Sequence, residues 1–129
     1  MAERTIAVIN DDTEFLRLMR LLLTQHGYQV TLHPTADAAY RALRAAPPDL
    51  MILDIRMETP EAGWQLLELL RLDPATAALP VLVCSADVVF LQAKEAHLRA
   101  EGYAVLEKPF GLTALLERIA ALLPSPPAS

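Results

Sequence analysis

Five short apolar runs alternate with five stretches of helical periodicity, and this alternation restricts the fold more than any other feature of the sequence. Apolar strands that are each followed by a helix predict a parallel sheet covered by helices on both faces. Right-handed crossovers leave few topologies, of which the flavodoxin-like strand order 2-1-3-4-5 is the expected one. We therefore predict a three-layer α/β fold of the (βα)5 type. The expected strands are 5–9, 28–32, 50–54, 81–85 and 104–107.

Capping residues mark where the helices should begin and end. Thr13 and Thr35 suit N-cap positions, because a side-chain oxygen there accepts hydrogen bonds from the first helical turn. Gly27 and Gly102 suit the position after a helix end, where the backbone often takes a positive φ. The expected helices run from 13 or 14 to 26, and over 36–46, 63–72, 88–101 and 112–123.

Length and composition favour one domain with a substantial core. The chain has 129 residues, of which 53% are hydrophobic, and this is ample for a single core. We expect a domain over residues 1–123 and a disordered Pro- and Ser-rich tail over 124–129. The net charge is −5 without any basic cluster, which argues against nucleic-acid binding by the domain.

Other features of the composition concern the compartment. No apolar run is long enough to span a bilayer, and the first residues lack a signal-peptide core. Cys84 is the only cysteine, so an intramolecular disulfide is excluded. We expect a cytoplasmic protein that does not bind membranes, with Cys84 as a small core residue.

Polar side chains follow several of the expected strands at the point where each strand ends. In a parallel sheet of this order, ligands bind beyond the carboxyl ends of the strands. Carboxylates, a hydroxyl and an ammonium group should therefore meet at one edge of the sheet. These residues are Asn10, Asp11 and Asp12 after the first strand, Asp54 in the third, Ser85 in the fourth and Lys108 after the fifth.

These residue types suit phosphoryl transfer assisted by a cation. Carboxylates from neighbouring strands, with backbone carbonyls and water, are the ligands that Mg²⁺ prefers. Asp54 ends an apolar strand, where an unpaired carboxylate is costly, and an aspartate can be the nucleophile for phosphoryl transfer. Ser85 and Lys108 carry groups that stabilise charge on phosphoryl oxygens. Each residue alone also has an ordinary reading as a cap, a strand end or a surface charge.

Four segments at these strand ends resemble the motifs of one family: VINDD, DLMILDIRM, LPVLVCSAD and LEKPF. Over about residues 4–123, the chain resembles a response regulator receiver domain, the CheY-like phosphoacceptor module of two-component signalling. The resemblance implies that Asp54 accepts a phosphoryl group from a histidine kinase or a histidine phosphotransfer protein. It also implies that Ser85 and Lys108 bind this group and couple it to a change on the face formed by the fourth and fifth helices and the fifth strand.

The resemblance further implies a metal ion at the same edge. Mg²⁺, with Mn²⁺ as a second candidate, would be held by Asp11, Asp54 and the backbone carbonyl of Arg56. Asn10 stands where the family usually has the outer acid of an acidic pair. An amide accepts a hydrogen bond from metal-bound water but lacks the charge. We therefore expect weaker Mg²⁺ binding, with Asp12 as a partial substitute in the outer contacts.

Other positions also differ from the family pattern. The segment between Asp54 and its following glycine is one residue longer than usual, with its proline displaced to Pro60. Val105 stands where an aromatic switch residue is common, so rotation of a ring cannot report phosphorylation there. Arg56 and Asp87 are both two residues beyond a site residue. We hypothesise that they pair across the site mouth and prolong the lifetime of the phosphoryl group.

The first helix carries more apolar residues than a core stripe needs. Phe15, Leu18, Met19, Leu22 and Leu23 already fill one stripe, and Leu16 and Leu21 broaden it. The extra leucines are either partner-docking residues or exposed leucines that the surface tolerates, and the sequence leaves both readings open.

Three classes of function are consistent with these features. The leading one is a stand-alone receiver that signals to an unknown downstream protein by contact or phosphorelay, with weak self-phosphotransfer and autodephosphorylation. The alternative is a degenerate receiver, a phosphorylation-independent interaction module, with Asn10 and Val105 as signs of decay. A phosphohydrolase-like enzyme would need a second acid two residues after Asp11, and Thr13 stands there.

Overall fold

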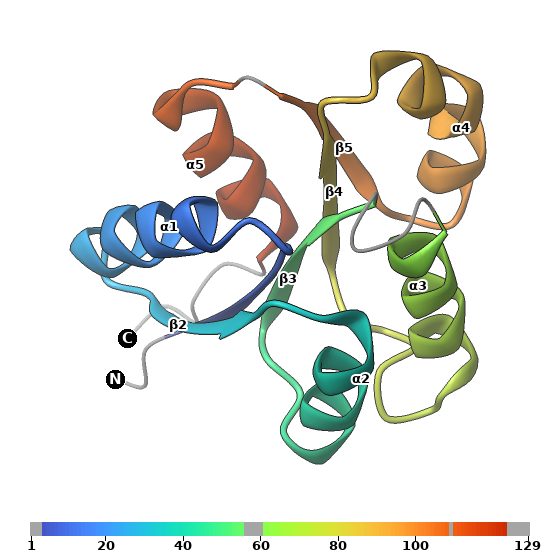
Figure 1. The fold of residues 1–129 in the computed structure, drawn as a ribbon, viewed down its shortest axis with the longest axis horizontal. Coiled ribbons are helices and arrows are strands. Elements are labelled where there is room, and N and C mark those ends of the chain that lie inside the picture. Colours follow the sequence, from blue (N-terminus) through green and yellow to red (C-terminus); the bar gives the residue numbers. More distant parts are fainter. Residues whose placement is uncertain (1–3, 56–60, 109, 124–129) are drawn as a thin grey trace.

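The computed structural model describes residues 4–55, 61–108 and 110–123. Within these residues, five parallel strands form one sheet in the order β2-β1-β3-β4-β5 (Figure 1), as the alternation of segments predicts. The strands are β1 (Thr5–Ile9), β2 (Gln29–His33), β3 (Leu50–Asp54), β4 (Val81–Ser85) and β5 (Ala104–Glu107). The helices are α1 (Thr13–Gln25), α2 (Ala36–Ala45), α3 (Ala62–Leu72), α4 (Val88–Ala100) and α5 (Leu112–Leu122).

Helices cover both faces of the sheet, with α1 and α5 on one side and α2, α3 and α4 on the other (Figure 1). Successive side chains of a strand point to opposite faces, so each central strand contributes to two cores. In β1, Ile6 and Val8 pack with α1 and α5, while Ala7 and Ile9 pack with the other three helices. β3 alternates in the same way, which explains why these strands are apolar at every position.

The helix ends largely follow the predicted caps. Gly27 and Gly102 have φ of 88° and 89°, as expected for the residue after a helix end. The Thr35 hydroxyl accepts a hydrogen bond from the Ala38 amide at 3.4 Å. The prediction of Thr13 as an N-cap is wrong. Asp12 caps α1 instead, because its carboxylate reaches the first helical amides and Thr13 is already helical.

The face of α1 that meets the sheet also differs from the prediction. Leu16, Met19 and Leu23 are buried, whereas Leu18 is 51% exposed and Leu21 is 56% exposed. The core stripe therefore contains Leu16 and excludes Leu18. Apolar residues surround so much of this helix that periodicity does not fix its rotation, and contact with the sheet decides it.

Connections at the amino ends of the strands are closed by hydrogen bonds. The Asp49 carboxylate accepts from the Thr5 amide at 2.7 Å. The Asp73 carboxylate accepts from the Ala75 amide at 2.9 Å, from the Tyr40 hydroxyl at 3.4 Å and from the Arg44 guanidinium. The pKa of Asp73 lies below its usual range, chiefly because of the Ala75 amide. These bonds tie α2 to the connection between α3 and β4.

Two further expectations concern the remainder of the chain. Across residues 4–55, 61–108 and 110–123, no helix has the length and apolar character needed to cross a bilayer. The expected tail at 124–129 lies outside the described residues.

Candidate functional site

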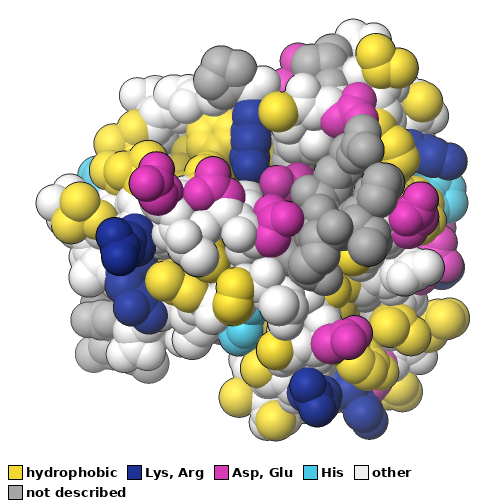
Figure 2. All heavy atoms as spheres, viewed as in Figure 1, with side chains coloured by type: hydrophobic (Ala, Val, Ile, Leu, Met, Phe, Trp, Pro, Cys, Tyr) yellow, Lys and Arg dark blue, Asp and Glu magenta, His cyan; other side chains and the backbone are white. Residues whose placement is uncertain are grey.

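The carboxyl ends of the strands bring the predicted side chains to one edge. Asp54 ends β3, and its register partner in β4 is Cys84. The Lys108 amide donates to the Ser85 carbonyl at 2.9 Å, which ties the residue after β5 to the end of β4. On the face drawn in Figure 2, acidic side chains gather beside a basic side chain and an apolar patch.

Asp54 and Lys108 form the central contact of this edge. The Lys108 Nζ lies 3.2 Å from the Asp54 Oδ2, although the two residues are 54 positions apart in the sequence. The Lys108 side chain is 19% exposed and the Asp54 side chain is 13% exposed. The pair is therefore largely shielded from water, and its opposite charges compensate each other.

The aromatic ring of Phe15 lies against the same ammonium. The Lys108 Nζ is 4.2 Å from the centroid of this ring, which is a cation–π distance. The ring of Phe110 meets the ring of Phe15 edge-on at 6.4 Å. Sequence reasoning assigned Phe15 to an apolar stripe and missed this contact. The sequence feature that could have indicated this contact is that Phe15 lies in the first turn of a helix that begins at the carboxyl edge of the sheet.

The three polar residues after β1 take different positions. Asn10 is buried, and its Oδ1 accepts from the Asp12 amide at 2.8 Å. Its Nδ2 is also buried and has no hydrogen-bond partner among the described residues. The Asp12 carboxylate accepts from the Glu14 and Phe15 amides at 3.0 and 3.3 Å, whereas Asp11 is exposed. Only Asp11 of the three thus presents an exposed carboxylate that is not capping the helix.

The end of β2 flanks this run. The Asn10 amide donates to the His33 carbonyl at 3.1 Å. The His33 ring is half-buried and its Nε2 lies 3.0 Å from the Thr31 Oγ1. Burial lowers the pKa of His33 below its usual value of 6.5, so its neutral form is favoured.

Ser85 and Asp87 are joined by a local hydrogen bond. The Ser85 Oγ accepts from the Asp87 amide at 3.0 Å, and Ser85 is 2% exposed. Its hydroxyl proton is still available for donation, since a hydroxyl both donates and accepts. The Asp87 carboxylate caps α4 by accepting from the Phe90 amide at 2.9 Å. Arg56 lies outside the described residues, so the hypothesised pair of Arg56 and Asp87 remains a prediction.

Two residues of β4 and β5 contribute to the core. Val105 is 4% exposed and packs in the cluster that includes α4. Cys84 is buried, as predicted, and burial raises the pKa of its thiol to about 12, although the Lys108 charge opposes this. The thiol is therefore neutral and is not a nucleophile here.

A glycine that follows the strand-three acid lies against the backbone of β3. A Cβ built on Gly63 would lie 2.3 Å from the Ile55 carbonyl oxygen and 2.6 Å from that of Asp54. Any side chain there would displace either α3 or the strand end. Gly63 therefore sets how closely α3 approaches the residue that carries the carboxylate.

The donor set gives a test of the implied Mg²⁺. Among the described residues, no group of three or more His, Cys, Asp or Glu is arranged to hold a metal. Asp11 and Asp54 supply carboxylate oxygens, and Mg²⁺ is often held by only one or two carboxylates with water. The buried Asn10 Nδ2 is a donor and cannot bind a cation. The chemistry of these donors is therefore compatible with Mg²⁺, and Asp11 and Asp54 as its protein ligands remain a prediction.

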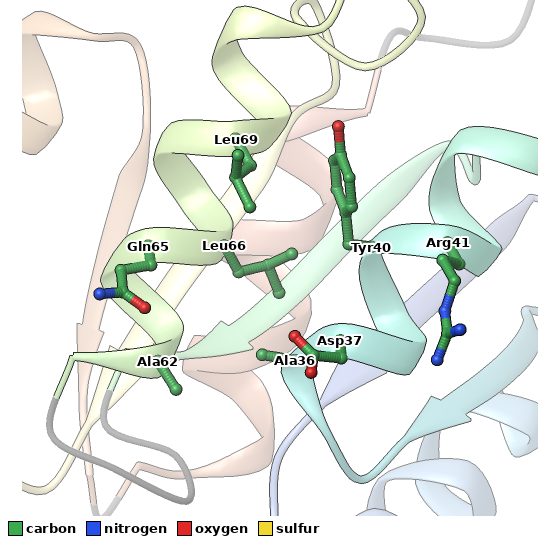
Figure 3. Close-up of a pocket in the computed structure, with 8 residues that line it drawn as sticks. All are labelled: Ala36, Asp37, Tyr40, Arg41, Ala62, Gln65, Leu66 and Leu69. Carbon is green, nitrogen blue, oxygen red and sulfur yellow. The ribbon is translucent and has the colours of Figure 1, made fainter.

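A cleft of about 540 Å³ lies between α2 and α3 (Figure 3). Tyr40 and Leu66 lie on its facing sides in the close-up. Its lining contains none of the predicted site residues, so it gives no support to a second reaction centre. The lining residues are Ala36, Asp37, Tyr40, Arg41, Ala62, Gln65, Leu66 and Leu69.

Comparison with known proteins gives one consistent family. The family model described as the response regulator receiver domain matches residues 6–120. The DNA-binding transcriptional regulator NtrC of Rhizobium meliloti is 34% identical over 126 residues, covering 98% of this chain and 25% of the relative. The transcriptional regulatory protein KdpE of Mycobacterium tuberculosis is 35% identical over 116 residues, covering 90% of this chain and 49% of the relative.

A solved structure gives the same result. A putative response regulator from Chloroflexus aurantiacus superposes with a TM-score of 0.82 at 26% identity. The alignment covers 94% of this chain and 98% of that structure. By contrast, the chain spans about a quarter of NtrC and half of KdpE. The match to those regulators is therefore a match to one part of each.

Proposed function

Because the chain belongs to the family of response regulator receiver domains of two-component systems, we propose that Asp54 accepts a phosphoryl group from a histidine kinase or a histidine phosphotransfer protein. The observation that carries this proposal is the contact of Asp54 with the Lys108 ammonium at 3.2 Å. A fixed cation beside a carboxylate nucleophile can stabilise the charge that a phosphoryl group brings.

In the proposed reaction, a carboxylate oxygen of Asp54 attacks the phosphorus atom of a phosphohistidine. The new O–P bond forms as the P–N bond breaks, and the histidine ring leaves with the electrons of that bond. Lys108 exchanges the carboxylate for phosphoryl oxygens, and the Ser85 hydroxyl donates to the same oxygens. Mg²⁺ or Mn²⁺, when bound by Asp11 and Asp54, supplies further positive charge to these oxygens.

Incubation with acetyl phosphate and Mg²⁺ tests this function without a partner protein. We expect one acid-stable, base-labile phosphoryl group per chain, absent from Asp54→Asn. Mg²⁺ should also change the fluorescence of Trp64, which lies in the first turn of α3, directly after the glycine that packs against the Asp54 backbone. If neither incorporation nor a fluorescence change occurs, the degenerate receiver is the better description.

One observation favours that alternative. Where many receivers have an aromatic switch residue, this chain has Val105, which packs in the core and has no ring that could turn between exposed and buried states. Signalling by an aromatic switch at this position is therefore excluded. A phosphorylated receiver would have to signal through another part of the face formed by α4, β5 and α5, by contact with a downstream protein or by phosphorelay.

An apolar cleft of about 440 Å³ beside Lys108 supports a protein as the phosphodonor. Amphipathic helices bind in such grooves through apolar residues at helical spacing. Leu18 lines the cleft and is half-exposed, so it is the leucine of α1 that would contact the donor. Of the two extra leucines, Leu16 is buried and Leu21 is exposed outside the cleft lining, so the cleft does not support docking by either of them. The lining residues are Phe15, Leu18, Met19, Leu22, Ala86, Lys108, Phe110, Leu112 and Leu115.

A substitution in this cleft separates protein donors from small ones. We expect Leu18→Ser to slow transfer from a phosphorylated histidine phosphotransfer protein about tenfold and to leave the rate with acetyl phosphate unchanged. Leu72→Ser is the matched control, since Leu72 is exposed but lies at the far end of α3. An equal loss with both donors would show that Leu18 acts on the site itself and does not bind the donor.

A further inference from the structure

Both lysines of this chain lie over aromatic rings. The sequence contains only Lys94 and Lys108. The Lys94 Nζ is 5.4 Å from the centroid of the Trp64 ring, whereas the Lys108 Nζ is 4.2 Å from that of Phe15. The attraction between a cation and a ring grows at shorter distance and with less water. The contact of Phe15 with Lys108 is the shorter of the two, and its ammonium belongs to a side chain that is only 19% exposed.

The Phe15 ring is itself held in place from two directions. Its backbone amide donates to the Asp12 carboxylate at 3.3 Å, so the residue belongs to the capped first turn of α1. The Phe110 ring packs edge-on against it, and both rings adjoin the core cluster between α1, α5 and the sheet. A ring fixed in this way presents a constant surface to the ammonium.

The ammonium of Lys108 thus has two neighbours of different kinds. The Asp54 carboxylate is 3.2 Å away, and the Phe15 ring lies 4.2 Å away. A lysine ammonium sits on a flexible four-carbon stem and otherwise prefers water. The Phe15 ring limits the positions that the ammonium can take. Unlike a second carboxylate, the ring does not neutralise the charge of the ammonium.

We propose that Phe15 is a positioning residue that holds the Lys108 ammonium at the carboxyl edge, where it meets the incoming phosphoryl oxygens; this inference rests on the function proposed above. When Asp54 gains a phosphoryl group, its ion pair with Lys108 is replaced, but the contact with the ring is retained. The ammonium then needs to move only a short distance to reach the phosphoryl oxygens, because it is already held beside Asp54 and away from bulk water. Such preorganisation lowers the barrier to phosphoryl transfer.

Substitutions of phenylalanine rings test the effect on the reaction. Phe15→Leu keeps apolar volume but removes the ring, and Phe15→Tyr keeps the ring. Phe90→Leu is the matched control, because the Phe90 ring contacts Trp64 and packs against the core cluster on the other face of the sheet. With acetyl phosphate and saturating Mg²⁺, we expect Phe15→Leu to slow incorporation about three- to tenfold, the range for one shielded cation–π contact. Phe15→Tyr and Phe90→Leu should stay within about twofold of the parent rate.

A spectroscopic measurement tests the geometry without phosphoryl transfer. Labelling with [¹³C]lysine gives two sets of side-chain signals, which Lys94→Arg assigns. The methylene protons next to the Lys108 ammonium should be shifted upfield by the face of the Phe15 ring. Phe15→Leu should abolish this shift and leave the Lys94 signals unchanged, while Trp64→Leu should do the reverse.

The two measurements distinguish failure of this inference from failure of the proposed function. If the parent protein takes up no phosphoryl group, the proposed function fails, and the Lys108 signals still decide whether Phe15 positions the ammonium. The inference is wrong if Phe15→Leu leaves the Lys108 signals in place. It is also wrong if Phe15→Leu reacts at the parent rate, or if Phe90→Leu slows the reaction equally.

Discussion

The two edges of the sheet use aspartates in opposite ways. At the amino edge, Asp49 and Asp73 accept hydrogen bonds from backbone amides and close connections between elements. At the carboxyl edge, Asp11 is exposed, and the charge of Asp54 faces the Lys108 side chain. Asp49 and Asp73 therefore stabilise the fold at the amino edge. At the carboxyl edge Asp12 and Asp87 also stabilise the fold, as helix caps, so the contrast concerns the predicted site residues Asp11 and Asp54.

The local chain explains this difference. Asp73 is followed by a turn whose amide at Ala75 points back at the carboxylate, and this amide is the main cause of its lowered pKa. Asp54 is the last residue of a strand, and its partner comes from the residue after β5, far away in the sequence. A carboxylate paired with a side chain can change partners, whereas one bound to the backbone cannot do so without unfolding the turn.

The sharpest test exchanges the two aspartates for amides. We expect Asp54→Asn to lose all phosphoryl incorporation from acetyl phosphate, because an amide is not a nucleophile of this kind. Asp73→Asn should incorporate phosphoryl groups at the parent rate but unfold at a lower temperature, since its ion pair with Arg44 is lost. If Asp73→Asn also loses incorporation while remaining folded, the division between the edges does not hold.

The second test concerns the backbone beside Asp54. Gly63→Ala should lower the free energy of unfolding by about 1–3 kcal/mol, because its Cβ would lie 2.3 Å from the Ile55 carbonyl oxygen. Incorporation at Asp54 should also slow, since the strand end must shift.

Gly111→Ala is the matched control for this substitution. Gly111 is the N-cap of α5, and a Cβ there meets nothing within 4 Å. We expect a loss of only about 0.5 kcal/mol, as for a cap residue changed to alanine. Equal losses in chemical denaturation of both variants would contradict the close approach of α3 to β3.

The third and smallest effect is the pH dependence of stability, which should differ between His33 at the carboxyl edge and Asp73 at the amino edge. Burial lowers the folded pKa of His33 below 6.5, so the unfolded chain binds this proton more readily and stability falls as the pH drops below 6.5. The pKa of Asp73 lies below 3.8, so its stabilisation is present above pH 3.8 and is lost only as the pH falls through the lower folded value.

Thermal unfolding between pH 3 and 8 should show these two phases. His33→Gln is expected to flatten the phase just below pH 6.5, and Asp73→Asn the phase at the acid end. His26→Gln, at an exposed helix end, should leave both phases in place. Persistence of the upper phase in His33→Gln would assign it to another group.

Much of the fold could be predicted because it depends on pattern and topology. The alternation of strands and helices determines the sheet order, and the sheet order brings the ends of β3 and β5 to the same edge. Asp54 and Lys108 could therefore be expected near each other from the sequence, while their chemical roles remain predictions.

Contacts that depend on the rotation of a helix about its axis, or on how far a side chain extends, could not be predicted in this way. The rotation of α1 is ambiguous because its apolar residues cover more of its surface than a core stripe needs, so the burial of Leu16 was not predicted. Asp12 and Thr13 are both good caps, and only the position of the first turn decides between them. The contact of Phe15 with Lys108 requires side-chain positions from two elements far apart in the sequence, which no local pattern records.

The burial of Cys84 has a practical consequence for measuring motion in this protein. It is the only thiol of the chain, and at neutral pH it is protonated and shielded from solvent. A cysteine introduced at an exposed position, such as Ala93 on α4, would therefore react alone with a maleimide dye or spin label. The native protein thus serves as a cysteine-free background for distance measurements, and its core thiol need not be replaced.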